Sequence, residues 1–234
     1  SMLEMISGKS IYKSPTDMGV NMAGNCIVDD DACCKASKCE IIRRYYKCLC
    51  EQRINGFAKD DLYKLELLMN QAGISTSYRQ VVTKASEKSA QTNGHPAVAI
   101  ELPDGTVVTG KTGDLLGASA SALLNALKEL AGIDHELDLV SATSIAPIQK
   151  LKTDYLGSHN PRLHTDEILI ALSTSAADNE LAARALEQLP KLNGCDAHST
   201  VILSSVDDKM FKRLGIQLTC EPKYEEEERL YHKS

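Results

Sequence analysis

Residues 105–112 read GTVVTGKT, which matches the pattern of a nucleotide-binding P-loop: Gly, any four residues, then Gly-Lys-Thr. In a P-loop, curled backbone N–H groups hold the phosphates of a nucleoside triphosphate, and the Lys and Thr reach the phosphates and Mg²⁺. Here residues 106–109 are all β-branched, and such side chains favour extended backbone. The preceding Pro-Asp-Gly is a turn sequence. We therefore predict a β-hairpin, with NTP binding at 105–112 as an alternative.

The segment LGSHNPRLHTDE, residues 156–167, delivers one arginine and two histidines to the start of a predicted helix. Thr165 is suited to cap that helix, and the two acidic residues after it complement the helix dipole. A guanidinium group next to a helix N-terminus favours phosphate or carboxylate. We predict anion binding here, with a metal site and a purely structural loop as alternatives. The candidate residues are His159, Asn160, Arg162 and His164.

A third polar segment, KSPTDMGVNMAGNC, covers residues 13–26. Short hydrogen-bonding side chains alternate with glycines, which is typical of an ordered loop that lines a site. Local Asx and Ser/Thr turns would satisfy the same groups without any ligand, and this alternative stays open. The candidate ligand-binding residues are Lys13, Ser14, Thr16, Asp17, Asn21 and Asn25.

Six of the eight cysteines lie within the first fifty residues. A structural zinc site usually takes its ligands from repeated Cys-x-x-Cys pairs, and this sequence has none. Cys39 and Cys50 are eleven positions apart, which places them on one face of a helix. We expect reduced thiols in a cytosolic protein, no metal, and no cofactor that the sequence identifies.

Helical patterns dominate the first part of the chain. Asp29–Asp31 are good N-cap and first-turn residues for a helix that ends near Arg53. A second helix is predicted from Asp60 or Asp61 to Gly73, and it should bury Leu62, Leu65, Leu68 and Met69. The polar stretch 76–93 is expected to join this helical part to the remainder of the chain.

A different pattern starts at His95. The hairpin 97–110 comes first, and a leucine-rich helix then runs to Gly132. Further helices are predicted at 144–156, 165–177 and 179–189, and strands at 199–204 and 216–220 with a short helix around 209–214 between them. This order predicts an α/β layered domain with a mixed sheet, preceded by a helical segment. The predicted division is 1–92, 93–223 and a charged tail at 224–234.

Composition excludes several classes of function. The net charge is −6 and the pI is near 5.6, whereas a nucleic-acid-binding protein needs clustered Lys and Arg. Aromatic residues make up 4% of the chain and there is no Trp, so base-stacking surfaces are not expected. No run of about 18 apolar residues is present. We expect a cytoplasmic protein that binds neither nucleic acid nor membranes.

These segments together resemble one known family. The stretches KSPTDMGVNMAGNC, EIIRRYY, HPAVAIELPDGTVVTGKT, LKTDYLGSHNPRLHTDE, CDAHSTVILSSVD and LGIQLTCEPKY closely resemble a mainly bacterial family, domain of unknown function eighteen-forty-six. The resemblance covers residues 12–224. It implies that the members are longer, that this chain is similar to their C-terminal part, and that a P-loop-like stretch belongs to their N-terminal half. It implies no particular activity.

Two functions are expected from these patterns. In the first, the loops at 13–25 and 157–164 form one side of a polar cleft for a small phosphorylated or carboxylated metabolite, within an enzyme. In the second, the chain is a non-catalytic assembly module that forms a homo-oligomer through its helices. If the first is correct, His159 and Arg162 should lie near Lys13 or Asn21, because side chains cannot bridge loops about 20 Å apart.

Overall fold

The computed structural model describes residues 29–56 and 59–225. Within these ranges the helices and strands come in this order: α2 (Asp30–Asn55), α3 (Lys59–Gln71), α4 (Gln80–Gln91), β1 (Ala97–Glu101), β2 (Val107–Lys111), α5 (Ala118–Ala131), α6 (Ala142–Lys150), α7 (Thr165–Ser175), α8 (Glu180–Leu186), β3 (Asp196–Ser199), α9 (Ser205–Arg213) and β4 (Gln217–Cys220). The candidate loop at 13–25 lies outside the described residues, as does most of the predicted tail.

The strands of the described chain form one sheet in the order β2-β1-β3-β4. Strand β1 pairs antiparallel with both β2 and β3, and β3 pairs parallel with β4. The prediction of an α/β fold with a mixed sheet is therefore confirmed. Because of these directions, β1 begins at the same edge of the sheet where β2, β3 and β4 end.

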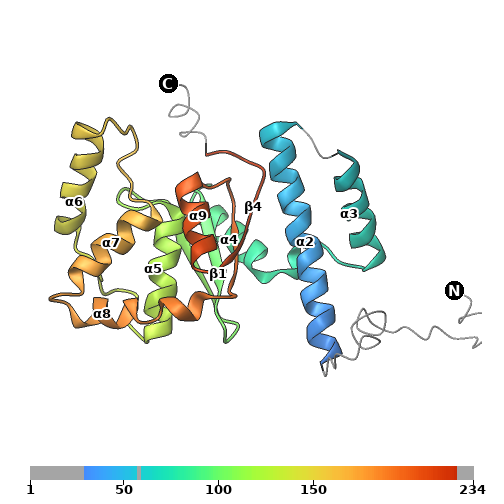
Figure 1. Cartoon of the computed structure of the whole chain (residues 1–234), viewed down its shortest axis with the longest axis horizontal. Helices are drawn as coiled ribbons and strands as arrows, with labels where there is room; N and C mark the ends of the chain where they lie inside the picture. Colours follow the sequence, from blue (N-terminus) through green and yellow to red (C-terminus); the bar gives the residue numbers. More distant parts are fainter. Residues whose placement is uncertain (1–28, 57–58, 226–234) are drawn as a thin grey trace, which may run out of the picture.

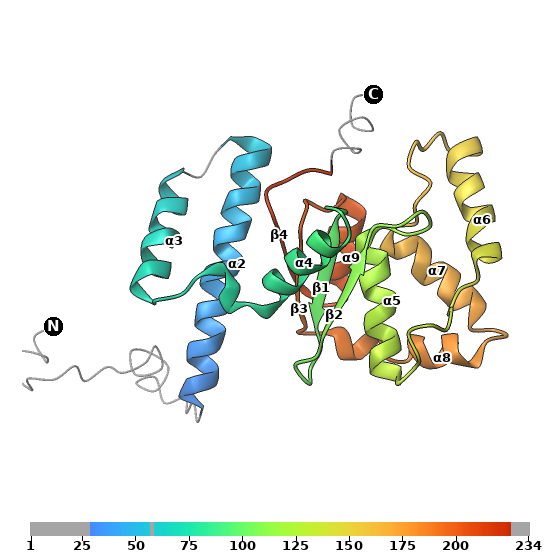
Figure 2. The same ribbon diagram turned by 180° about the vertical axis from the view of Figure 1, so that it is seen from behind.

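Helices cover the sheet on both faces (Figures 1 and 2). Successive residues of a strand point to opposite faces, so Val98 and Ile100 pack with α5 while Ala99 packs with α4. Helices α7, α8 and α9 lie on the α5 side, and their apolar residues join the same main core. Helices α2 and α3 lie beyond strand β4, as both views show.

The hairpin predicted at the P-loop-like sequence is confirmed. Strands β1 and β2 pair from Ala97↔Lys111 to Glu101↔Val107. Gly105 closes the turn with a φ of 86°, which the Pro-Asp-Gly sequence predicts. A Cβ atom at Gly110 would collide with the backbone of Ala122 in α5. The alternative of a P-loop is therefore wrong, because 107–111 is extended strand and Gly110 is needed for packing between a strand and a helix.

The first two helices agree with the sequence in their limits but not in all their buried residues. Asp29 caps α2 by accepting a hydrogen bond from the N–H of Ala32 at 2.8 Å. Ile42 and Tyr46 of α2 pack with Met69 of α3. Leu68, which the helical pattern placed in the interior, is 45% exposed.

The stretch 76–93 is not a simple linker, since most of it is helix α4. Val81 and Ala85 of this helix pack on the sheet at Ala99. Just before it, the buried side chain of Arg79 donates hydrogen bonds to Asp196 at 2.7 Å and to Thr219 at 2.6 Å. The polar composition of 76–93 suggested a linker because only one narrow face of α4 is apolar.

Strand β3 was predicted three residues too late in the chain. The strand is Asp196–Ser199, and the apolar residues Val201 to Leu203 come after it as irregular backbone. The buried ring of His198 in β3 has a partner at one nitrogen: Nδ1 lies 2.9 Å from Oγ1 of Thr219. The segment after β3 leads to the start of α9, which begins four residues earlier than predicted.

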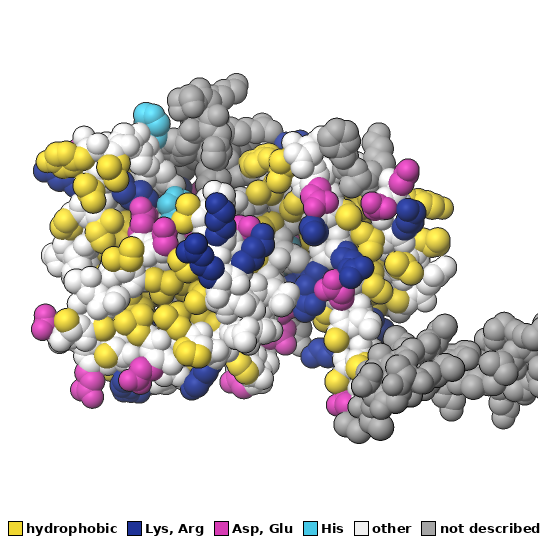
Figure 3. Space-filling model, in the orientation of Figure 1, with side chains coloured by type: hydrophobic (Ala, Val, Ile, Leu, Met, Phe, Trp, Pro, Cys, Tyr) yellow, Lys and Arg dark blue, Asp and Glu magenta, His cyan; other side chains and the backbone are white. Residues whose placement is uncertain are grey.

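Two surface features complete the fold. Figure 3 shows basic side chains over α9 and the neighbouring part of α2. Acidic partners lie among them: Lys212 is 2.6 Å from Asp208, and Arg44 is 2.9 Å from Glu40. This face therefore carries paired charges rather than a continuous basic patch.

In the described ranges, no helix has both the length and the apolar character that crossing a membrane requires.

Candidate functional site

A small cavity opens at the edge of the sheet where β1 begins and β2 and β3 end. It leaves about 30 Å³ for water-sized molecules. Because one water needs about 10–15 Å³ in this measure, the space fits two or three waters or one small ion. Segments far apart in the chain line it: Pro96, Thr112, Gly117–Ser119, Asn160, Arg162–His164, Val201–Ser204, Asp207 and Glu225.

Among the described residues, three helices begin at this cavity. Their N-cap residues are Gly117 for α5, His164 for α7 and Ser204 for α9, and all three line it. The starts of α5 and α7 are held side by side because the N–H of Gly117 donates to the carbonyl of Leu163 at 3.2 Å. A helix N-terminus carries partial positive charge and N–H groups without intrahelical acceptors. The cavity is therefore suited to anions.

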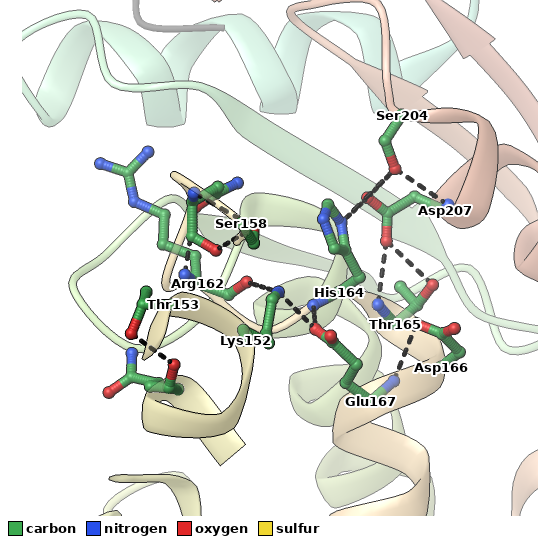
Figure 4. Close-up of polar contacts among 12 residues, drawn as sticks. Lys152, Thr153, Ser158, Arg162, His164, Thr165, Asp166, Glu167, Ser204 and Asp207 are labelled. Carbon is green, nitrogen blue, oxygen red and sulfur yellow. Dashed lines mark hydrogen bonds and ion pairs between the residues drawn. The ribbon is translucent and has the colours of Figure 1, made fainter. Parts of the chain in front are cut away.

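Two of these N-termini are capped by the protein itself. One oxygen of Asp207 accepts hydrogen bonds from both the N–H and the Oγ1–H of Thr165, each at 2.9 Å. In α9, the hydroxyl of Ser204 accepts from the N–H of Asp207 at 3.2 Å. Figure 4 shows these contacts together with that of Glu167, which accepts from the N–H of His164 at 2.8 Å. The starts of α7 and α9 thus need no ligand.

The start of α5 differs, because Gly117 has no side chain with which to cap it. The first-turn N–H groups of Ala118, Ser119 and Ala120 have no acceptor within the helix. Two of these residues, Ala118 and Ser119, line the cavity. This N-terminus is therefore open to an acceptor that occupies the cavity.

Two nearly buried residues with hydroxyl groups line the same space. Thr112 is 5% exposed and Ser119 is 2% exposed, and both line the cavity. Neither hydroxyl has a hydrogen-bond partner among the described residues. Two hydroxyls without a protein partner in one cavity are available to water or to a ligand that enters it.

His164 is held at the cavity by contacts to one of its two ring nitrogens. Nδ1 lies 3.0 Å from Oδ2 of Asp207 and 3.4 Å from Oγ of Ser204. Ser204 in turn donates to Oδ2 of Asp207 at 2.8 Å. Because both partners meet Nδ1, Ser204 is not a nucleophile activated by Nε2, as in a serine hydrolase triad. Nε2 is the ring atom that remains for a ligand.

His164 and Asp207 each stabilise the charged form of the other. The hydrogen bond with Asp207 is the main cause that raises the pKa of His164 above its usual 6.5, against the effect of burial. Burial acts to raise the pKa of Asp207, but its hydrogen bond with His164, the charge of that ring and the bonds from Thr165 and Ser204 lower it to about 2. At neutral pH Asp207 is thus ionised and favours the protonated imidazole.

Several polar groups of the loop before α7 are paired within the protein. The amide oxygen of Asn160 accepts from the N–H of Arg162 at 3.0 Å. The buried ammonium of Lys152 donates to the carbonyl of Arg162 at 2.6 Å and to Glu167 at 2.7 Å. Lys152 belongs to a π-helical turn (Leu151–Tyr155) that continues α6, where a single α-helix was predicted. Nη1 of Arg162 lies 3.1 Å from Oε1 of Glu225.

The predicted site residues separate into three groups. Asn160, Arg162 and His164 line the cavity. His159 is exposed and does not line it. The other group, Lys13, Ser14, Thr16, Asp17, Asn21 and Asn25, lies outside the described residues.

Ser119, Ser204 and Asp207 also line the cavity, although the sequence did not single them out. Thr112 lines it too, and the sequence had considered this residue only in the P-loop alternative. Ser119 lies in the predicted leucine-rich helix, whereas Ser204 was predicted as the last residue of a strand. Where the structure describes the chain, no group of three or more His, Cys, Asp or Glu side chains is arranged to hold a metal ion.

Comparison with known proteins places the chain in a family. The family model "Domain of unknown function DUF1846, C-terminal" matches residues 77–231, and "Domain of unknown function DUF1846, N-terminal" matches residues 1–73. The resemblance had implied the C-terminal part alone. The border between the two matches lies just before α4, so this helix belongs with the sheet that it covers.

Full-length relatives agree with this result. The chain is 56% identical over 225 residues to a UPF0371 protein of Corynebacterium glutamicum (strain R), covering 96% of this chain and 45% of the relative. It is 50% identical over 233 residues to a UPF0371 protein of Streptococcus pneumoniae (strain JJA), covering 100% and 47%. The chain spans about half the length of these relatives. Its matches to both family models and to these proteins show that it belongs to the DUF1846 family.

Proposed function

We propose that the cavity at the start of α5 binds the phosphate or carboxylate group of a small metabolite, as part of a metabolite enzyme. One observation carries this proposal: the hydroxyls of the nearly buried residues Thr112 and Ser119, which have no partner among the described residues, line the cavity beside the uncapped N-terminus of α5. Hydroxyls and helix amides are both hydrogen-bond donors, and an anion accepts from all of them.

The charges around the cavity support the same ligand. His164 favours its protonated form, and Arg162 also lines the space. Two carboxylates lie nearby, but both are engaged by cationic side chains: Asp207 by His164, and Glu225 by Arg162. A small anion therefore meets the positive end of α5 and an imidazolium rather than two unpaired carboxylates.

His164 gives the site a group that can transfer protons. Asp207 fixes the ring by Nδ1 and favours the imidazolium, so the second nitrogen, Nε2, is left to meet the bound group. Histidine donates and accepts protons in many enzymes, and the raised pKa of His164 favours the form that donates. An arrangement that binds an anion next to such a histidine suits an enzyme better than a passive assembly module.

Isothermal titration calorimetry with inorganic phosphate and with acetate tests this proposal. The chain should bind at least one of these ions, and the double substitution Thr112→Val, Ser119→Ala should weaken binding by about 4- to 100-fold, at about 2- to 10-fold for each lost hydrogen bond. Ser121→Ala is the matched control, because Ser121 lies in the same helix and does not line the cavity. No binding of either ion, or equal affinities in the double variant and the control, would refute the proposal.

A further inference from the structure

A second and much larger cleft adjoins the anion cavity. It leaves about 740 Å³ for water-sized molecules. Pro96, Val201 and Glu225 line both spaces, so the two meet at these residues. The cavity alone holds only a small ion, whereas the cleft has room for the rest of a metabolite attached to that ion.

The side chains that line the cleft are mainly polar and non-aromatic. Hydroxyl, amide, imidazole, ammonium and carboxylate groups are all represented, in Ser86, Ser89, Asn93, His95, Thr200, Glu221 and Lys223. The ring of Tyr224 also lines it, but the guanidinium of Arg53 lies 5.9 Å from the centre of that ring. Such a lining offers many hydrogen bonds to hydroxyl groups, whereas its one aromatic ring, which Arg53 already contacts, offers little stacking surface to a nucleobase.

The cleft contains two carboxylates, Glu221 and Glu225, beside one ammonium, Lys223. Helix α4 ends at this cleft, so its negative pole lies there. Glu221 is ionised at neutral pH, because hydrogen bonding with His198 lowers its pKa despite burial. Carboxylates and carbonyls accept hydrogen bonds from hydroxyls and repel anions. A ligand with one anionic end and one hydroxylated end is therefore oriented by the two spaces.

The number of donors in the cavity distinguishes phosphate from carboxylate. The α5 amides, the hydroxyls of Thr112 and Ser119 and Nε2 of His164 belong to residues from three segments that line the cavity. A carboxylate accepts only in its own plane through two oxygens, whereas a phosphate monoester presents three terminal oxygens in a tetrahedron. Donors from several separate segments suit the larger number of acceptor oxygens of the phosphate monoester.

We propose that the ligand of this site is the phosphate monoester of a hydroxylated, non-aromatic metabolite such as a sugar or polyol, with its phosphate in the cavity and its hydroxyl groups in the cleft lined by Ser89 and Asn93. This inference rests on the proposed anion binding. In the described chain, neither the side chain of Ser89 nor that of Asn93 has a hydrogen-bond partner, so both are available to substrate hydroxyls.

The test compares affinities measured by isothermal titration calorimetry. The probes are inorganic phosphate, glycerol 3-phosphate, ribose 5-phosphate, glucose 6-phosphate and AMP. At least one of the three non-aromatic esters should bind about tenfold or more tightly than inorganic phosphate, since each added hydrogen bond is worth a factor of about 2 to 10. That ester should also bind more tightly than AMP.

Two substitutions locate the hydroxylated end. Ser89→Ala and Asn93→Gly together should reduce the affinity for that ester by about fivefold or more and leave the affinity for inorganic phosphate unchanged. Glycine suits position 93, where φ is 56°. Melting temperature serves as the check on folding.

The outcomes separate the two proposals. Binding of inorganic phosphate without tighter binding of any non-aromatic ester overturns this inference and leaves the proposed anion binding in place. AMP as the tightest ligand also overturns it, as does an ester affinity that the double variant does not change. If neither inorganic phosphate nor any ester binds, both this inference and phosphate binding by the cavity are wrong.

Discussion

Oδ2 of Asp207 lies 3.0 Å from Nδ1 of His164, although 43 positions separate the two residues in the chain. The other oxygen of the same carboxylate accepts from the N–H and the hydroxyl of Thr165, the next residue after His164. A single side chain at the start of α9 therefore fixes both the first turn of α7 and the ring at its N-cap. This relationship sets the charge and orientation of His164 at the cavity.

Replacing Asp207 by Asn should lower the pKa of His164. The hydrogen bond with the carboxylate is the largest cause that raises this pKa, and an amide supplies neither the charge nor the same acceptor. NMR titration of the histidine ring signals measures the change directly. Asp208→Asn is a suitable control, because Asp208 is paired with Lys212 on the exposed side of α9. A His164 pKa that stays the same in Asp207→Asn would contradict the assigned pairing.

The same pair should make stability depend on pH at acidic pH. The pKa of Asp207 is lowered from 3.8 to about 2 in the folded state, so its contribution is present above the unfolded pKa and is lost as pH falls towards 2. A shift of this size corresponds to about 2 kcal/mol of unfolding free energy. Denaturant unfolding of wild type and Asp207→Asn between pH 6 and about 2 should therefore converge at low pH. Curves that stay parallel would contradict this.

The pH dependence of the stability contribution has the opposite direction for His164. Its folded pKa is raised, so the stabilisation is complete below the unfolded pKa near 6.5 and is lost as pH rises through the folded value. The stability difference between wild type and His164→Gln should shrink as pH rises above 6.5. The same unfolding series, extended to alkaline pH, measures it, and a difference that grows with pH would be inconsistent with the raised pKa.

Thr112→Val should weaken phosphate binding without loss of stability. The Thr112 hydroxyl has no hydrogen-bond partner in the described chain, so its removal breaks no contact within the protein and removes a buried polar group. Thr165→Val is the matched control, since its buried hydroxyl donates to Asp207 and its loss should cost about 1–3 kcal/mol. Thermal unfolding compares the two. A large destabilisation by Thr112→Val would show that its hydroxyl serves the fold instead.

Gly110→Ala should destabilise the protein by about 3 kcal/mol or more, because its Cβ would collide with the backbone of Ala122, which cannot yield as a flexible side chain does. At Gly113, three positions later, the added methyl meets no atom of the described chain within 4 Å, so Gly113→Ala should change stability by no more than about 0.5 kcal/mol. Equilibrium unfolding measures both, and similar values for the two variants would contradict the packing role of Gly110.

Local patterns predicted much of the fold. Asp29 capped α2 as expected, and the leucine spacing before Gly132 gave α5 and its end. The Pro-Asp-Gly turn identified the hairpin against a competing motif. These features depend on residues that are close in the sequence, where helix caps, turns and apolar periodicity act.

Long-range effects explain the failures. Val201 to Leu203 resemble a strand, but β3 is the preceding Asp196–Ser199, whose buried His198 is stabilised by Thr219 on a neighbouring strand. The same holds for the cavity. The sequence of the polar loop was enough to predict His164 as a site residue. The roles of Thr112 and Asp207 depend on three helix starts that meet at one sheet edge. Local sequence patterns do not predict which helix starts come together, because this depends on the topology of the fold.

The most direct measurement of anion binding monitors the backbone amides of α5. Two-dimensional ¹⁵N–¹H NMR spectra would be recorded while inorganic phosphate is added at constant ionic strength, with chloride as the comparison. The signals of Ala118, Ser119 and Ala120 should shift in a saturable way with phosphate and not with chloride, because these N–H groups donate to the bound ion. Unchanged α5 amides at saturating phosphate, or equal shifts with chloride, would contradict the proposed site.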